Sequence, residues 1–166
     1  MKKLNDPDFG AMYFEDRKQV WTLERQVNFN GYKIPLEIYP ENEQTLAISP
    51  VQRQAVKIAL NLPSDTLVKS APAVIQNYEC YDESLDGEAL PELKNPIDIW
   101  NLIEPDYISV PAHSFPPYYE VKIPTFFLKA ECFWDAEHGL EVRFRNGYAD
   151  ESDQQGHLRV AIDRAN

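Results

Sequence analysis

The side chains with the clearest chemical potential gather in one short segment, Asp135-Ala-Glu-His-Gly139. Two carboxylates and an imidazole so close together could bind a metal ion or exchange protons with a substrate. A structural interpretation is also open, in which Asp135 accepts hydrogen bonds from the amides of a tight loop and Gly139 adopts a positive φ. Asp135, Glu137 and His138 are therefore one candidate polar site, for a substrate or a small ligand.

Other motifs for catalysis or cofactor binding are incomplete. The three histidines, His113, His138 and His157, do not have the spacing of a helical metal pair. The polar loop that begins at Asp150 lacks the glycine and the glutamate that an EF-hand calcium loop requires. Neither a glycine-rich phosphate loop nor a dinucleotide-binding motif occurs. We therefore expect no catalytic residues, no metal and no cofactor, so that the protein is not an enzyme.

A second candidate site is an acidic segment in the middle of the chain. From Ser70 to Leu93 there is no lysine or arginine, while acidic residues and two tyrosines cluster there. Aromatic side chains can anchor a partner protein and carboxylates can steer a basic one toward it. The candidate residues are Tyr78, Glu79, Tyr81, Asp82, Glu83, Asp86 and Glu88. The alternative is an ordinary solvated helix end and loop.

The composition limits the class of partner. The chain has 166 residues, 43% of them hydrophobic, and a formal net charge of -11. We expect one domain over residues 1–166 that does not bind nucleic acid or a membrane, because its charge repels phosphates and anionic lipids. The alternative is that the acidity only favours solubility. The N-terminus does not resemble a signal peptide and no segment is long and apolar enough to span a membrane, so we expect a cytoplasmic protein. Its two cysteines, Cys80 and Cys132, are expected to be buried.

A β-hairpin is predicted on either side of the polar segment. Phe126, Leu128, Ala130, Cys132 and Trp134 alternate with other residues before the segment, and Leu140, Val142 and Phe144 alternate after it. This period of two is typical of half-buried antiparallel strands. We therefore expect strands near 126–134 and 140–145, with their apolar faces directed to the core.

The remaining elements favour an α+β fold. A first hairpin is predicted over residues 20–39, with Asn30-Gly31 as its turn. Helical spacing and caps predict helices near 50–62, 65–78 and 95–103, with Pro72 kinking or restarting the second. Strands are expected at 107–110, 118–123 and 158–162, and a polar loop at 149–156. The order of strands, helices and strands predicts an antiparallel sheet with helices packed on one face.

The predicted C-terminal hairpin also carries a family resemblance. The run Trp134-Asp-Ala-Glu-His-Gly-Leu140, followed by Val142-Arg-Phe-Arg-Asn-Gly147, resembles an uncharacterised bacterial domain family with a WDxEHGLxVxFxNG hairpin near its C-terminus. Members of that family that stand singly or beside polymorphic toxins suggest a role in toxin immunity. The polar loop after Gly147 departs from the shorter tail of the family pattern. The resemblance implies no catalytic residues.

Two hypotheses about function follow. The first is a non-enzymatic immunity protein that binds and neutralises a cognate toxin domain, which the charge of this chain predicts to be basic. The second is a small enzyme or a ligand-binding domain with its polar site at the tip of the 134–140 hairpin. An adjacent toxin gene would favour the first hypothesis.

Overall fold

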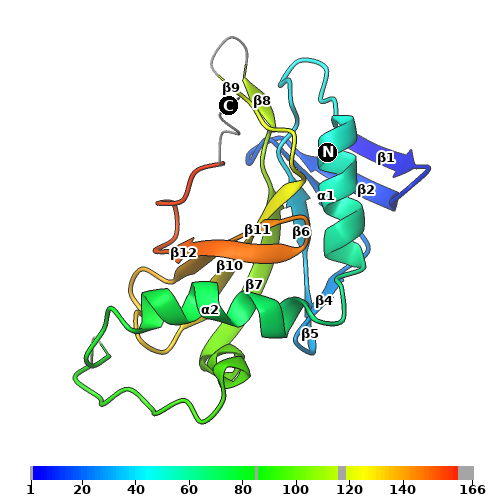
Figure 1. Cartoon of the computed structure of the whole chain (residues 1–166). Coiled ribbons are helices and arrows are strands. Elements are labelled where there is room, and N and C mark those ends of the chain that lie inside the picture. The colour runs from blue at the N-terminus through cyan, green and yellow to red at the C-terminus, as the bar shows by residue number, and fades with distance from the viewer. Residues whose placement is uncertain (1, 85, 116–118, 161–166) are drawn as a thin grey trace.

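A single mixed sheet dominates the computed structural model, which describes all residues except 1, 85, 116–118 and 161–166 (Figure 1). The strands of this sheet, in spatial order, are β1 (Lys2–Asp6), β2 (Gly10–Glu15), β3 (Val20–Leu23), β6 (Leu36–Ile38), β7 (Ile103–Val110), β10 (Thr125–Cys132), β11 (Leu140–Arg145) and β12 (Tyr148–Asp153). Strands β6 and β7 are parallel, and the other neighbours are antiparallel. Two small antiparallel pairs lie outside it, β4 (Val27–Phe29) with β5 (Tyr32–Ile34), and β8 (Ser114–Phe115) with β9 (Tyr119–Glu120).

The predicted fold class is wrong. In the described residues the protein is mostly β, and its helices are the short α1 (Pro50–Leu60), α2 (Thr66–Tyr78) and the 3-10 helix η1 (Pro96–Leu102). All three belong to the connection between β6 and β7, the one parallel pair (Figure 1). A parallel pair needs a long crossover, usually helical, because a tight turn can only reverse the chain. The sequence pattern showed the helices but not the parallel pairing that they serve.

The helix starts follow local rules in part. Helix α1 begins as predicted, with Gln52 N donating to Ser49 Oγ and Ser49 N donating to Gln52 Oε1. Helix α2 runs through Pro72 without a restart, which leaves a kink as the other predicted effect of this proline. Asp65 stands at its N-cap position but makes no capping hydrogen bond, because its carboxylate bonds Lys69 and Tyr148 instead.

Both predicted turns are present. Strands β10 and β11 pair with Phe126 opposite Phe144, Leu128 opposite Val142 and Ala130 opposite Leu140, which confirms the C-terminal hairpin. At the first turn, Asn30 and Gly31 have φ of 48° and 85°, the signs that a type I′ turn requires. The hairpin there is shorter than predicted, because only β4 and β5 flank the turn. Strands β3 and β6 pair with each other in the large sheet instead.

Several local predictions are wrong. Residues 149–156, predicted as a loop, supply most of β12, and Leu158 to Val160 form no strand; Ile162 lies outside the described residues. The strand expected at 118–123 is reduced to β9, and Tyr118 also lies outside the described part. Cys132 is buried as predicted, whereas Cys80 is exposed. Cys80 follows directly after α2, so the helical face that would bury it has already ended.

The core lies on one face of the sheet and is rich in aromatic rings. Phe126 and Phe144 stack with their ring centres 5.0 Å apart, and Phe29 meets Phe144 edge to face. Two buried tryptophans extend this cluster and keep their indole N–H groups bonded, Trp100 to Leu67 O and Trp134 to Asn77 Oδ1, both at 2.8 Å. The aromatic cluster therefore fixes α2 and η1 against the C-terminal hairpin.

Candidate functional site

The acidic loop, defined here by Glu79, Asp82, Glu83, Asp86 and Glu88, follows the end of α2. All five side chains are exposed. Within the part of the chain that the structure describes, none of the five forms an ion pair. Two hydrogen bonds join Ser84 and Glu88 within the loop, from Ser84 N to Glu88 O at 2.8 Å and from Glu88 N to Ser84 Oγ at 3.1 Å. An ordered surface of uncompensated negative charge results.

The two tyrosines of the acidic segment are not exposed anchors. Tyr78 is only 7% exposed, packs edge to face on Trp134 with ring centres 5.1 Å apart, and donates its hydroxyl proton to Pro91 O. Tyr81 is half-buried and donates to Asp135 Oδ2 at 2.9 Å. Both therefore hold the acidic loop against the hairpin.

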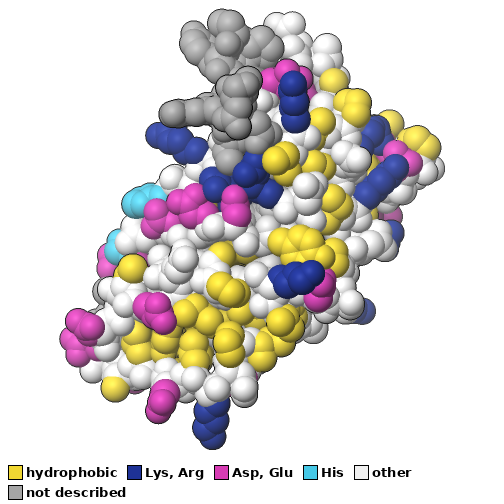
Figure 2. Space-filling model, viewed as in Figure 1, with side chains coloured by type: hydrophobic (Ala, Val, Ile, Leu, Met, Phe, Trp, Pro, Cys, Tyr) yellow, Lys and Arg dark blue, Asp and Glu magenta, His cyan; other side chains and the backbone are white. Residues whose placement is uncertain are grey.

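Val68 and Pro72 of α2 and Ile97 of η1 are exposed apolar residues, and the partly buried Ile75, Leu90 and Leu93 are grouped with them here. Val68, Pro72 and Ile75 follow one line along α2, because they are spaced by four and three residues. Val68 is 59% exposed, and Ile97 of η1 is 42% exposed. Figure 2 shows a continuous hydrophobic surface here, with acidic side chains at its margin. The apolar patch consists of Val68, Pro72, Ile75, Leu90, Leu93 and Ile97.

The hairpin tip is organised around Asp135, which is 2% exposed. Its Oδ1 accepts from the backbone N and from Nδ1 of His138, at 3.1 and 2.9 Å, and its Oδ2 accepts from Tyr81 and, at 3.4 Å, from Gln154. Burial acts to raise the pKa of Asp135, but these hydrogen bonds outweigh it and the pKa is lowered. Asp135 is therefore a carboxylate that ties three segments together.

The other two members of the predicted polar site, Glu137 and His138, are not buried as Asp135 is. The side chain of Glu137 is exposed, and that of His138 is about half exposed. Gly139 has a φ of 68°, and a Cβ there would lie 2.7 Å from Gln155 Nε2 and 3.0 Å from Ala130 O. Among the described residues, no group of three or more His, Cys, Asp and Glu side chains is placed to hold a metal ion. The geometry matches the structural interpretation of the tip.

A protein-family model, that of a domain of unknown function (DUF6985), matches residues 8–158 of the chain. The chain belongs to this family. The match includes the acidic loop, the apolar patch and the hairpin tip, so all three lie within the DUF6985 domain. Neither a curated protein nor a solved structure matches the chain. In the described residues of the domain, no helix has both the length and the apolar character needed to cross a bilayer.

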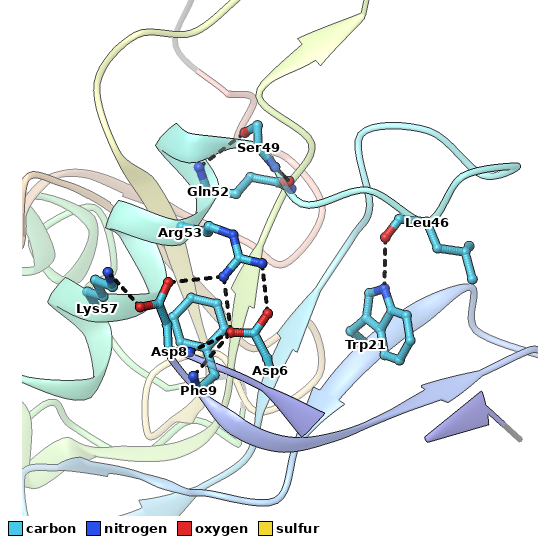
Figure 3. Close-up of polar contacts among 9 residues, drawn as sticks. All are labelled: Asp6, Asp8, Phe9, Trp21, Leu46, Ser49, Gln52, Arg53 and Lys57. Carbon is cyan, nitrogen blue, oxygen red and sulfur yellow. Dashed lines mark hydrogen bonds and ion pairs between the residues drawn. The ribbon is translucent and has the colours of Figure 1, made fainter. Parts of the chain in front are cut away.

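A charged cluster that the sequence did not reveal joins α1 to the start of the DUF6985 domain (Figure 3). Arg53 of α1 bonds Asp6 and also Asp8, and Lys57 bonds Asp8 at 3.2 Å. Asp6 is buried, and its Oδ1 also accepts from the backbone N of Asp8 and of Phe9. The hydrogen bond from Arg53 is the main cause that lowers the pKa of Asp6. With its acceptors occupied in this way, the cluster is a structural one.

His113 is a second buried polar group with a structural role. Its Nε2 accepts from Thr125 N at 2.9 Å, so the neutral ring carries its proton on Nδ1 and donates it to Pro111 O. Burial lowers the pKa of His113. The neighbouring Ser114 hydroxyl donates to Glu41 at 2.9 Å, not to His113. These contacts fasten the end of β7 to the beginning of β10.

Proposed function

We propose that this chain is a non-enzymatic immunity protein of the bacterial cytoplasm, which binds a basic toxin domain and blocks it by covering its active surface. The observation that carries the proposal is the acidic loop, whose five exposed carboxylates have no cationic partner in the described structure and lie beside the apolar patch. The hairpin motif Trp134 to Gly147 supports it further, because it resembles an uncharacterised bacterial domain family whose members suggest a role in toxin immunity.

The two surfaces have complementary parts in such binding. Negative charge speeds the encounter with a positively charged protein and orients it, and this effect weakens as salt is added. Burial of apolar side chains then slows dissociation. Val68 and Ile97 are better placed for that contact than Tyr78, because they are exposed whereas Tyr78 is buried. A toxin that acts on nucleic acid needs a basic surface, which suits this arrangement.

The alternative of a polar site at the hairpin tip has less support. A substrate or a metal ion would have to displace Tyr81, His138 or Gln154 from the carboxylate of Asp135, which already accepts from all three. Displacement would cost the hydrogen bonds that these partly exposed groups make to the buried carboxylate, about 0.5–1.5 kcal/mol for each.

The test compares two triple charge reversals in their binding to the product of the gene beside this one, which the proposal expects to be a toxin. Asp82, Glu83 and Asp86 are changed to Lys in one variant, and the exposed residues Glu24, Glu43 and Glu104 in the other. Both variants undergo the same change in net charge, so only the position of the charge differs. We expect the first to associate about tenfold more slowly at low salt and to lose protection of cells, and the second to stay close to the parent.

Val68→Ser tests the apolar contribution. We expect it to raise the dissociation rate with little change in the association rate, because the patch acts after the encounter. If the acidic-loop variant associates and protects like the parent, the acidic loop is not the interface. If the unmodified chain forms no complex with the product of the neighbouring gene, or if that product is not toxic, the immunity function is wrong.

A further inference from the structure

The face of the sheet that points away from the core carries polar and aromatic side chains. Side chains alternate between faces along a strand, so Ile108, Phe126 and Leu128 enter the core while their neighbours point the other way. Across β7 and β10, Ser109 lies opposite Phe127, and Tyr107 lies opposite Lys129. This second face also includes Glu37 of β6 and Glu141 of β11, which continue the same rows.

The C-terminal segment, residues 154–160, crosses part of this second face. Glu141 Oε2 accepts from Gly156 N at 3.2 Å and from Leu158 N at 3.0 Å, and Arg143 Nη1 donates to Arg159 O at 3.0 Å. Between the segment and the sheet lies a cavity of about 380 Å³, within the range of small-molecule sites. Its lining includes Tyr39, Tyr107, Ser109, Phe127, Leu158 and Val160.

Three hydroxyl groups in this lining have no hydrogen-bond partner within the described structure: those of Tyr39, Tyr107 and Ser109. Ser109 is 6% exposed as a residue, Tyr107 is half-buried and Tyr39 is 39% exposed, and none of the three hydroxyls is cut off from solvent. Each hydroxyl is therefore free to exchange bound water for a ligand. A hydroxyl both donates and accepts. Burial raises the pKa of both tyrosines, so they keep their protons at neutral pH. The cavity therefore offers three neutral donor–acceptor groups.

The two charged side chains that line the cavity, Lys129 and Glu141, are paired with each other. Lys129 Nζ donates to Glu141, and both side chains are largely buried. At the adjoining end of the face, Lys18 Nζ donates to Glu37 at 3.0 Å. A charged ligand would have to break one of these pairs or stay without a counter-charge, and either costs free energy. Leu158, Val160 and Phe127 add apolar surface for the C–H face of a ring.

We propose that this cavity is a binding site for a neutral, polyhydroxylated ring of monosaccharide size, a sugar or a cyclic polyol, held by the hydroxyls of Tyr39, Tyr107 and Ser109 and covered by Leu158 and Val160. The site is distinct from the acidic loop and does not depend on the proposed immunity function.

The experiment titrates the full-length protein with neutral probes, D-glucose and myo-inositol, up to their solubility limits. Amide NMR signals of β7 and β10 report binding. D-glucuronate and D-glucosamine are matched probes that carry one charge, and uracil is a neutral planar ring without the hydroxyls. We expect at least one neutral polyol to shift the signals of residues 107–109 and 127–129, and to bind at least about tenfold more tightly than the charged rings.

Variants then test the three hydroxyls. Ser109→Ala and Tyr107→Phe each remove one hydroxyl, and each should weaken binding about three- to tenfold. Tyr32→Phe is the matched control, because Tyr32 is exposed on β5 outside this cavity. Thermal unfolding of each variant shows that it is folded. The proposal is overturned if neither neutral polyol binds, if a charged ring or uracil binds as tightly, or if both hydroxyl variants bind like the parent.

Discussion

The guanidinium group of Arg53 donates two parallel hydrogen bonds to the carboxylate of Asp6, Nη1 to Oδ1 at 3.0 Å and Nη2 to Oδ2 at 2.7 Å. This pair connects α1 to the end of β1, and Asp6 is buried. The forked geometry is the one that makes an arginine–carboxylate pair specific as well as strong.

Arg53→Met should lower the free energy of unfolding by about 3 kcal/mol, because it leaves a buried carboxylate without its cation. Lys57→Met is the matched control, since Lys57 is exposed and pairs only with the partly exposed Asp8. The control should change stability by less than about 1 kcal/mol. Urea unfolding measures both. Equal effects of the two substitutions would contradict the importance of the forked pair.

Phe144→Ala should cost about 3–5 kcal/mol of unfolding free energy. Phe144 is fully buried, stacks on Phe126 and meets Phe29, so its removal leaves a cavity at the centre of the aromatic cluster. Phe133→Ala on the same hairpin serves as the control, because Phe133 is 40% exposed. Thermal and urea unfolding report the difference. A Phe144→Ala protein as stable as the parent would show that the facing of β11 is wrong.

The stability of the protein should fall as the pH is lowered from 7 to 5. Burial places the pKa of His113 in the folded state below its value of 6.5 in the unfolded chain. The unfolded state therefore binds the proton first, and stability present above pH 6.5 is lost below it, by at most about 2 kcal/mol at pH 5. His113→Gln should flatten this part of the stability–pH curve. His157→Gln, at an exposed position, is the control substitution.

Tyr81→Phe should loosen the acidic loop from the hairpin tip. The substitution removes the hydroxyl that donates to Asp135, with an expected cost of about 1–2 kcal/mol. Amide hydrogen exchange in residues 82–88 should become faster, while exchange in β10 stays the same. Tyr32→Phe, an exposed position, is again the control. Unchanged exchange in the loop would mean that the backbone contacts of Ser84 order it without Tyr81.

The sequence predicted those elements whose signal is local. The β10–β11 hairpin was predicted because both strands alternate and a glycine ends their loop. Helix α1 was predicted because Ser49 is an N-cap residue, Pro50 suits the first helical position and apolar residues follow at helical spacing. Both edge strands were missed. Strand β12 has no buried residue, so its pattern is that of a loop. Its order comes from pairing with β11 and from distant bonds, Ala149 N to Ser70 Oγ and Ser152 Oγ to Ala73 O.

The candidate sites likewise combine features that neighbouring residues reveal with features that depend on contacts between distant residues. The acidic loop was evident as a run without lysine or arginine, because charge is a property of neighbouring residues. The burial of its tyrosines was not evident from the sequence, because Tyr81 bonds Asp135, which lies 54 positions further along the chain. The second-face cavity unites Tyr39, Tyr107 and Val160 only after the parallel pair β6–β7 has formed, and no periodicity in the sequence reports that pairing.

The absence of a side chain at Gly139 affects the position of the C-terminal segment, residues 154–160. Gln155 Nε2 occupies the space where a Cβ would stand and donates to Ala130 O at 2.9 Å, which seats the beginning of the C-terminal segment on the hairpin. A methyl group at position 139 would displace Gln155 Nε2 and weaken its hydrogen bond to Ala130 O. The same segment continues to Leu158 and Val160, which roof the second-face cavity. The glycine in the turn between β10 and β11 thus leaves room for the Gln155 amide, at the start of a segment whose later residues line the second-face cavity.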